Sequence, residues 1–186
     1  PGLTIDGSPT RGAADARIVL ISYEDFKNIG SAQHVLTIEP ALSAKYVAAG
    51  QMRLVYACFA DTAPRAAVAA LCEARQDKFW EFRSLLYQER ANWTEYVDHD
   101  DPIMRDYAAS LGLDTVAFDG CLIDPSARSQ VDAYYQFARD QIGVPYAPSF
   151  LLIHVNQAGV VEAVKALVGP QTLEAIEQAI RELLSN

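Results

Sequence analysis

The chain has 186 residues, of which 51% are hydrophobic and 21% are charged, and its net charge is −9. These values are typical of a single globular domain. The acidic balance argues against nucleic acid or an anionic membrane surface as the main partner. No apolar run reaches the roughly 18 residues that a membrane span needs, so no membrane span is expected.

The first predicted elements alternate between strand and helix. Residues 17–23 are a short β-branched apolar run, which predicts a buried central strand. Ser31 is a suitable N-cap for a helix that Gly50 ends. Pro40 should kink this helix, because its ring clashes with the preceding turn. Residues 52–59 predict a second strand.

The middle of the chain is predicted to be helical. Apolar residues recur at helical spacing over residues 64–113. Asp114 is a suitable cap for a short helix that extends to residue 122, and a longer helix should follow over residues 125–143. This region is therefore expected to form a helical block.

The end of the chain returns to strands. Residues 149–155 and 160–168 predict two strands, and the turn between them makes a hairpin. Pro170 should start a final amphipathic helix. The order is then βαβ, a helical block and ββα, which is the thioredoxin pattern of an α/β fold with a central mixed sheet. We expect residues 1–62 and 143–186 to form the thioredoxin-like domain and residues 63–142 an inserted helical domain.

Four stretches carry a family resemblance over nearly the whole chain. They are residues 22–26, 76–82, 111–122 and 143–150, which read SYEDF, QDKFWEF, LGLDTVAFDGCL and GVPYAPSF. With these stretches in this order, the sequence resembles the DsbA-like thiol-disulfide oxidoreductases of bacteria. The resemblance implies a thioredoxin-like fold with a helical insertion of the DsbA kind.

The catalytic cysteines of that family are missing. Relatives carry Cys-x-x-Cys after the first strand, where the helix N-terminus stabilises a thiolate. The matching positions here read Asn28-Ile29-Gly30-Ser31. Asparagine forms no thiolate, and serine is a poor nucleophile without an adjacent base. The family's dithiol chemistry is therefore not expected, and no catalytic residue is assigned.

The resemblance implies that a peptide-facing surface is kept. Pro148, preceded by Ala147, matches the cis proline that faces the cysteine pair in relatives and exposes the backbone of the residue before it. The alternative is that Pro148 only starts an edge strand. With a cis proline, Ile29, Gly30, Ala147 and Pro148 would contact an extended peptide.

The three cysteines lie outside the degenerate motif. Relatives often carry cysteines at the positions of Cys72 and Cys121, which implies a structural disulfide, and two buried thiols are the alternative. Cys58 lies near the end of a predicted strand and is expected to be a small core residue.

The histidines suggest no metal site. His34 stands near the degenerate motif and could carry a proton beside Ser31, but a solvated residue in the first turn is the favoured interpretation. His99 lies in an acidic run over residues 98–101, which is expected to be solvated, and His154 lies in a strand. The spacing of histidines and cysteines fits no metal, and no cofactor is expected.

Two functions remain open. The first is a redox-inactive protein that binds extended or unfolded peptide segments of other proteins. The alternative is a glutathione-dependent enzyme that resembles the kappa-class transferases and uses Ser31, although their working serine matches Asn28. A disulfide would suit a periplasmic or secreted protein, with a cytoplasmic one as the alternative. Residues 1–9 lack the order of a signal peptide, so a leader, if there is one, is expected outside this sequence.

Overall fold

The computed structural model describes residues 2–3, 7–94 and 101–185. Within these residues six strands form one mixed sheet in the order β1-β2-β4-β3-β5-β6. Strands β3 and β4 are parallel, and all the other pairs are antiparallel. The strands are β1 (Gly2–Leu3), β2 (Pro9–Gly12), β3 (Ile18–Glu24), β4 (Met52–Cys58), β5 (Ser149–Val155) and β6 (Val161–Val168).

Helical segments lie between the strands and after the last one. The α-helices are α1 (Ile29–Gln33), α2 (Glu39–Leu42), α3 (Pro64–Ala74), α4 (Phe79–Gln88), α5 (Arg90–Trp93), α6 (Asp101–Ser110), α7 (Thr115–Leu122), α8 (Pro125–Phe137) and α9 (Leu173–Leu184). Three π-helical turns continue them, η1 (His34–Ile38), η2 (Ser43–Val47) and η3 (Ala138–Ile142). No helix among the described residues is long and apolar enough to cross a membrane.

The predicted central strands are correct. Strand β3 pairs with β4 on one side and with β5 on the other, so it is covered along both edges. Its apolar, β-branched sequence suits that position, because one face is buried and Val19 and Ile21 on the other are half-buried. Strand β2 was not predicted. Its Thr10 pairs with Val55 of β4, a contact between residues far apart in the sequence.

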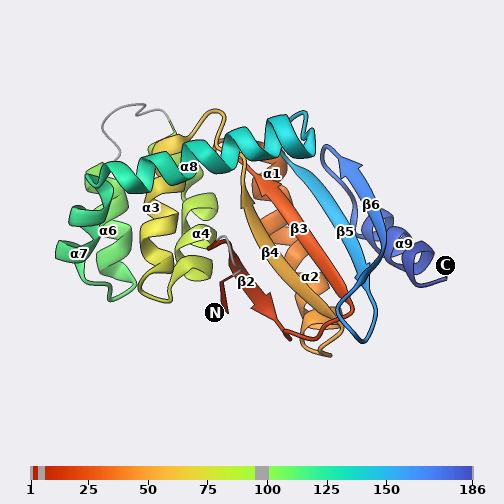
Figure 1. Ribbon diagram of the computed structural model, residues 1–186. Helices are drawn as coiled ribbons and strands as arrows, with labels where there is room; N and C mark the ends of the chain where they lie inside the picture. Colours follow the sequence, from red (N-terminus) through yellow and green to blue (C-terminus); the bar gives the residue numbers. More distant parts are fainter. Residues whose placement is uncertain (1, 4–6, 95–100, 186) are drawn as a thin grey trace.

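The helical block lies to one side of the sheet, and α8 runs from the block across the upper end of the strands (Figure 1). Within the block, Asp114 caps α7 as predicted, because its side chain accepts hydrogen bonds from the backbone N–H groups of Val116 and Ala117. Cys72 of α3 and Cys121 of α7 form a disulfide, with their Cα atoms 5.8 Å apart. The predicted boundaries of the inserted helical domain, at residues 63 and 142, stay a prediction. Ala138, near the second boundary, packs with Tyr23 of the sheet.

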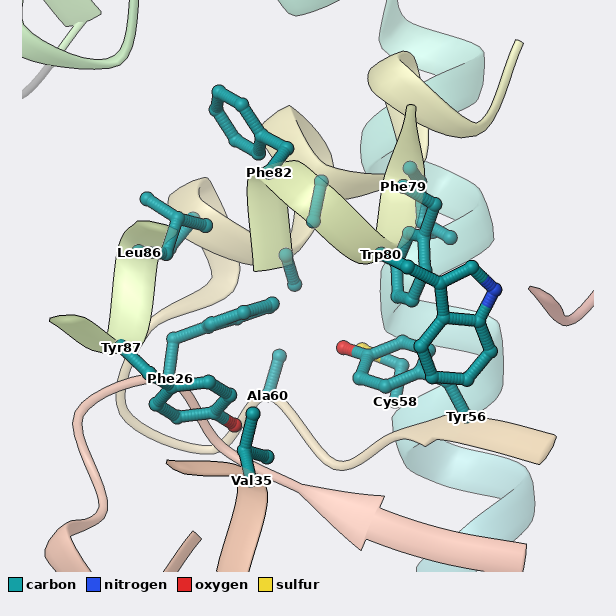
Figure 2. Close-up of a cluster of buried hydrophobic side chains, with 14 of the residues drawn as sticks. Phe26, Val35, Tyr56, Cys58, Ala60, Phe79, Trp80, Phe82, Leu86 and Tyr87 are labelled. Atoms are coloured by element: carbon teal, nitrogen blue, oxygen red, sulfur yellow. The ribbon is translucent and has the colours of Figure 1, made fainter. Parts of the chain in front are cut away.

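Aromatic residues join the block to the sheet. Figure 2 shows Phe26 beside Tyr87 of α4, and their ring centroids are 5.0 Å apart. Tyr56 of β4 contacts Phe79 at the start of α4, and their ring centroids are 4.8 Å apart. All four side chains are buried, so the sheet and the block share one hydrophobic core.

Two helix starts differ from their predictions. The first helix begins at Ile29 and is capped by Asn28, whereas Ser31 was the predicted cap. Asn28 has the extended backbone of an N-cap and precedes Ser31 by three residues. The last helix begins at Leu173 with Thr172 as its cap, and Pro170 lies before the helix.

Candidate functional site

The degenerate motif lies at the junction of β3 and α1. Asp25 follows β3, and its carboxylate accepts hydrogen bonds from the Lys27 N–H at 2.8 Å and from the Thr62 N–H at 2.6 Å. The Thr62 hydroxyl donates a third bond to it, at 2.8 Å. Buried Asp25 therefore holds the loop before α1 against the loop after β4.

Asn28 makes two hydrogen bonds with its side chain. Its Oδ1 accepts from the Ser31 N–H at 3.0 Å, which caps α1. Its Nδ2 donates to the carbonyl oxygen of Ala147 at 2.9 Å. The Ala147–Pro148 peptide bond is cis. The residue at the first cysteine position therefore ties the start of α1 to the loop before β5.

Gly30 makes the closest packing contacts at this junction. A Cβ atom on Gly30 would lie 2.8 Å from Pro170 Cγ and 3.1 Å from Pro148 Cδ. There is consequently no room for a side chain, and Gly30 is buried. Gly30 and Pro148 are both buried at this junction, so neither exposes a surface to a partner.

Ser31 is not placed to hold a thiol ligand. Its side chain is fully buried in the first turn of α1, and its Oγ accepts a hydrogen bond from the Asp25 N–H at 3.4 Å. A glutathione sulfur cannot reach this hydroxyl while α1 keeps its position. The geometry therefore gives the glutathione-dependent alternative no support.

His34 is buried rather than solvated, contrary to the favoured interpretation. The residue is 1% exposed, and its ring centroid lies 4.5 Å from that of Phe150 on β5. Neither ring nitrogen has a hydrogen-bond partner among the described residues. Burial lowers the pKa of His34 to about 4, so the ring is neutral at pH 7. A proton carrier exposed beside Ser31 is therefore not present.

A buried ionic cluster lies next to these elements. Arg83 of α4 donates to Glu24 at the end of β3, at 2.9 Å, and to Glu39 of α2, at 2.7 and 2.9 Å. The Tyr87 hydroxyl adds a bond to Glu24 at 3.1 Å. Burial raises the pKa of Glu24, whereas in Glu39 the contacts with Arg83 outweigh burial and lower the pKa. One guanidinium thus links the helical block to two elements that flank the degenerate motif.

None of the three cysteine sulfur atoms is available at this site. Cys72 and Cys121 form the disulfide, and Cys58 is the remaining free thiol. Cys58 is buried, as predicted, and burial raises its pKa to about 12. A thiol with so high a pKa is almost entirely protonated at pH 7, so it is not a nucleophile.

A pocket of about 430 Å³ opens beside Ala147. It brings together three of the residues predicted for the site, namely Asn28, Ile29 and Ala147. Ile29 is 72% exposed there. The side chain of Ile29 is therefore free to contact a partner.

Other pocket residues were not predicted from the sequence. Phe59 and Tyr146 add aromatic surface, and Tyr146 is 53% exposed. Lys27 and Arg90 add positive charge, and Arg90 reaches the pocket from the helical block by donating to the Lys27 carbonyl oxygen at 3.1 Å. The position of Tyr146, directly before Ala147-Pro148, was a signal that could have identified it. Nothing local in the sequence places Phe59 or Arg90 there.

Comparisons with known proteins agree with this architecture. A family model described as Thioredoxin matches residues 4–181. The comparison with curated protein sequences gave no significant match.

Several solved structures are similar over nearly the whole chain. The structure of alpha-DsbA1 from Wolbachia pipientis has a TM-score of 0.85 at 19% identity and covers 97% of this chain and 92% of its own. Oxidised BdbD from Bacillus subtilis has a TM-score of 0.80 at 18% identity, covering 99% of this chain and 96% of its own. DsbA from Chlamydia trachomatis has a TM-score of 0.75 at 16% identity, covering 100% of this chain and 94% of its own.

With sequence identities below 20%, the similar solved structures show the fold of this chain. The match to the family model shows its family. The mixed sheet and the helical block between β4 and β5 agree with this fold. The chain belongs to the thioredoxin family and is a DsbA-like thioredoxin-fold protein with a helical insertion.

Proposed function

We propose that this protein binds extended peptide segments of other proteins in the pocket beside Ala147, and that it does so without thiol-disulfide exchange. The observation that carries the proposal is the pairing of Asn28 with Ala147. It keeps the start of α1 and the cis-proline loop together in the absence of the cysteine pair, while Ile29 and Tyr146 stay exposed at the pocket.

The chemistry of the site supports the absence of exchange. Disulfide exchange needs a thiolate that attacks a disulfide sulfur. Asn28 and Ser31 have no sulfur, the two block cysteines are already bonded to each other, and Cys58 is buried with a raised pKa. A mixed disulfide with a substrate therefore has no starting thiol in the native fold.

The backbone of Ala147 supports peptide binding. Its N–H has no hydrogen-bond partner in residues 2–3, 7–94 and 101–185. Its carbonyl oxygen accepts one bond from Asn28 and keeps a second lone pair. An extended peptide that pairs with one residue's N–H and C=O gains main-chain affinity, and a neighbouring pocket adds side-chain selectivity.

The pocket beside this backbone suits an apolar side chain. Ile29, Phe59 and Tyr146 supply apolar and aromatic surface, and aromatic residues are enriched at recognition sites. Lys27 and Arg90 add cations near the same opening. The ligand is thus an extended segment with at least one large apolar side chain. The disulfide of the helical block supports an extracytoplasmic location, since disulfides persist in oxidising compartments.

A titration monitored by NMR tests the proposal. A cysteine-free unfolded peptide with alternating apolar residues is added to the isotope-labelled protein. We expect saturable shifts of the amide signals of Ile29, Tyr146 and Ala147. Replacing Ile29→Ser should weaken binding by roughly tenfold, because an apolar contact of this size is worth about 1–2 kcal/mol.

A matched control is available in the helical block. Val116 on α7 is 77% exposed, so Val116→Ser removes an equally exposed apolar side chain outside the pocket. This variant should bind as the native protein does. An absence of shifts near Ala147, or an equal loss of affinity in both variants, would show that the proposal is wrong.

A further inference from the structure

A second pocket, of about 420 Å³, lies between the sheet and the helical segment formed by α8 and η3. Its floor is the face of the sheet that carries Val19, Ile21, Leu151 and Ile153. These residues are direct neighbours across β3 and β5, because Val19 pairs with Ile153 and Ile21 with Leu151. The second pocket shares no lining residue with the pocket beside Ala147.

The roof of the second pocket is apolar and incomplete. Phe137 and Ile142 line it from α8 and η3, and they are 55% and 40% exposed. All four floor residues are partly exposed, although a sheet face of this composition is normally covered. The pocket volume lies within the roughly 300–1,000 Å³ that is typical of small-molecule sites.

One side of the second pocket is polar. Arg53 of β4 lines it there, on the β2 side of the sheet. Its Nη2 donates to the hydroxyl oxygen of Thr10 at 3.2 Å, whereas its buried Nε has no hydrogen-bond partner among the described residues. Within the same part of the chain Arg53 has no carboxylate in ion-pair distance. A guanidinium that has no carboxylate partner in this part of the chain and lines an apolar pocket favours an anion there.

We propose that the second pocket binds an amphipathic carboxylate with a medium-length apolar chain, such as a medium-chain fatty acid. Arg53 receives the carboxylate through the terminal hydrogens of its guanidinium group, whose planar arrangement matches the two carboxylate oxygens. The apolar chain lies over Ile21 and Leu151, beneath Phe137 and Ile142, where it covers surface that water now contacts. This site is independent of the peptide site and does not rest on its function.

The charge pattern selects this class of ligand. The protein carries a net charge of −9, so a long anionic surface or a nucleic acid would be repelled over most of the molecule. A small ligand with a single negative charge needs only the local field of Arg53. A cationic amphiphile would be repelled by Arg53, and a neutral one would form no ion pair with it.

Calorimetric titration with decanoate, kept below its micellar concentration, tests this proposal. We expect one saturable site per chain, and amide shifts in NMR spectra at Ala57, Leu151 and Ile153 rather than at Ala147. Arg53→Gln should weaken decanoate binding by about tenfold or more, because it removes a charge-assisted contact. Arg53→Lys should restore part of the affinity, since it returns the charge without the planar donor pair.

Decanol and decyltrimethylammonium serve as ligand controls. Decanol should bind more weakly than decanoate and equally well to the native protein and to Arg53→Gln. Circular dichroism and urea unfolding establish that the variants are folded. The proposal is overturned if decanoate shows no saturable binding, if decanol binds as tightly as decanoate, or if Arg53→Gln binds decanoate with native affinity.

Discussion

The side-chain Nδ2 of Asn28 lies 2.9 Å from the carbonyl oxygen of Ala147, although the two residues are 119 positions apart. The same side chain caps α1 through its Oδ1. One amide group therefore joins a helix start to the cis-proline loop, and only a side chain with both a donor and an acceptor can do this. Substitutions at Asn28 separate these two roles.

Asn28→Ala removes both hydrogen bonds and should lower the free energy of unfolding by about 1–3 kcal/mol, from the lost cap and the lost bond to Ala147. Asn28→Asp keeps the oxygen that caps α1 and loses the N–H donor. Its free energy of unfolding should therefore lie between those of the native protein and Asn28→Ala. Urea unfolding with an unchanged m-value measures both effects. Equal stabilities of the native protein and Asn28→Ala would contradict this prediction.

Asn28→Cys combined with Ser31→Cys should introduce the missing dithiol chemistry. The first thiol would lie at the N-terminus of α1, where the helix dipole lowers its pKa, and the second would lie one turn further along. The native protein should be inert in an insulin-reduction assay and the double variant active. The single variant Asn28→Cys is the control and should be inactive in turnover. Activity of the native protein would show that Cys58, Cys72 or Cys121 is reactive.

His34 should make the protein less stable in acid. Its pKa is about 4 in the folded state and 6.5 as its ordinary value, so the unfolded state binds more protons between these limits. The free energy of unfolding should therefore fall as the pH falls through this window, by roughly 3 kcal/mol at most. His34→Leu removes this contribution. The free energy of unfolding of the variant should therefore increase relative to that of the native protein as the pH falls from 7 to 4. Parallel pH profiles of the two proteins would rule out this role.

Arg83→Met should be strongly destabilising, by about 3–5 kcal/mol at pH 7, because it leaves Glu24 and Glu39 buried without a cation. The loss should shrink as the pH falls, since protonation removes the two buried charges. Arg128→Met is the matched control. It breaks an exposed pair with Asp132 at 2.9 Å and should change stability by less than about 1 kcal/mol. Similar losses in both variants would mean that burial of the cluster is unimportant.

Local sequence pattern identified most of the fold. The apolar runs of β3, β4 and β5, the Asp114 cap of α7 and the start of α8 at Pro125 depend on neighbouring residues, which periodicity and capping rules describe. Strand β2 escaped prediction because Pro9-Thr10-Arg11-Gly12 has no apolar alternation and contains both proline and glycine. It is a strand because β4 pairs with it, which is a tertiary effect.

The errors in the candidate site have similar causes. Ser31 and Asn28 are both good N-caps three residues apart, and the choice between them depends on the distant Ala147 carbonyl. His34 was expected in solvent, and the π-helical turn that begins there shifts the phase on which a helical-face argument depends. Arg90 and Phe59 reach the pocket beside Ala147 through folding of the block onto the sheet, which no local pattern encodes.

The absence of sulfur from the start of α1 has a consequence for the lifetime of any complex. In a dithiol protein a covalent intermediate holds the substrate until a second thiol resolves it. Here the only free thiol among the described residues is buried in β4, so a bound peptide would leave by dissociation alone. Its residence time would depend entirely on the non-covalent contacts of the pocket beside Ala147. The proposed function thus predicts that trapping partners as mixed disulfides fails, whereas chemical crosslinking or rapid affinity capture retains them.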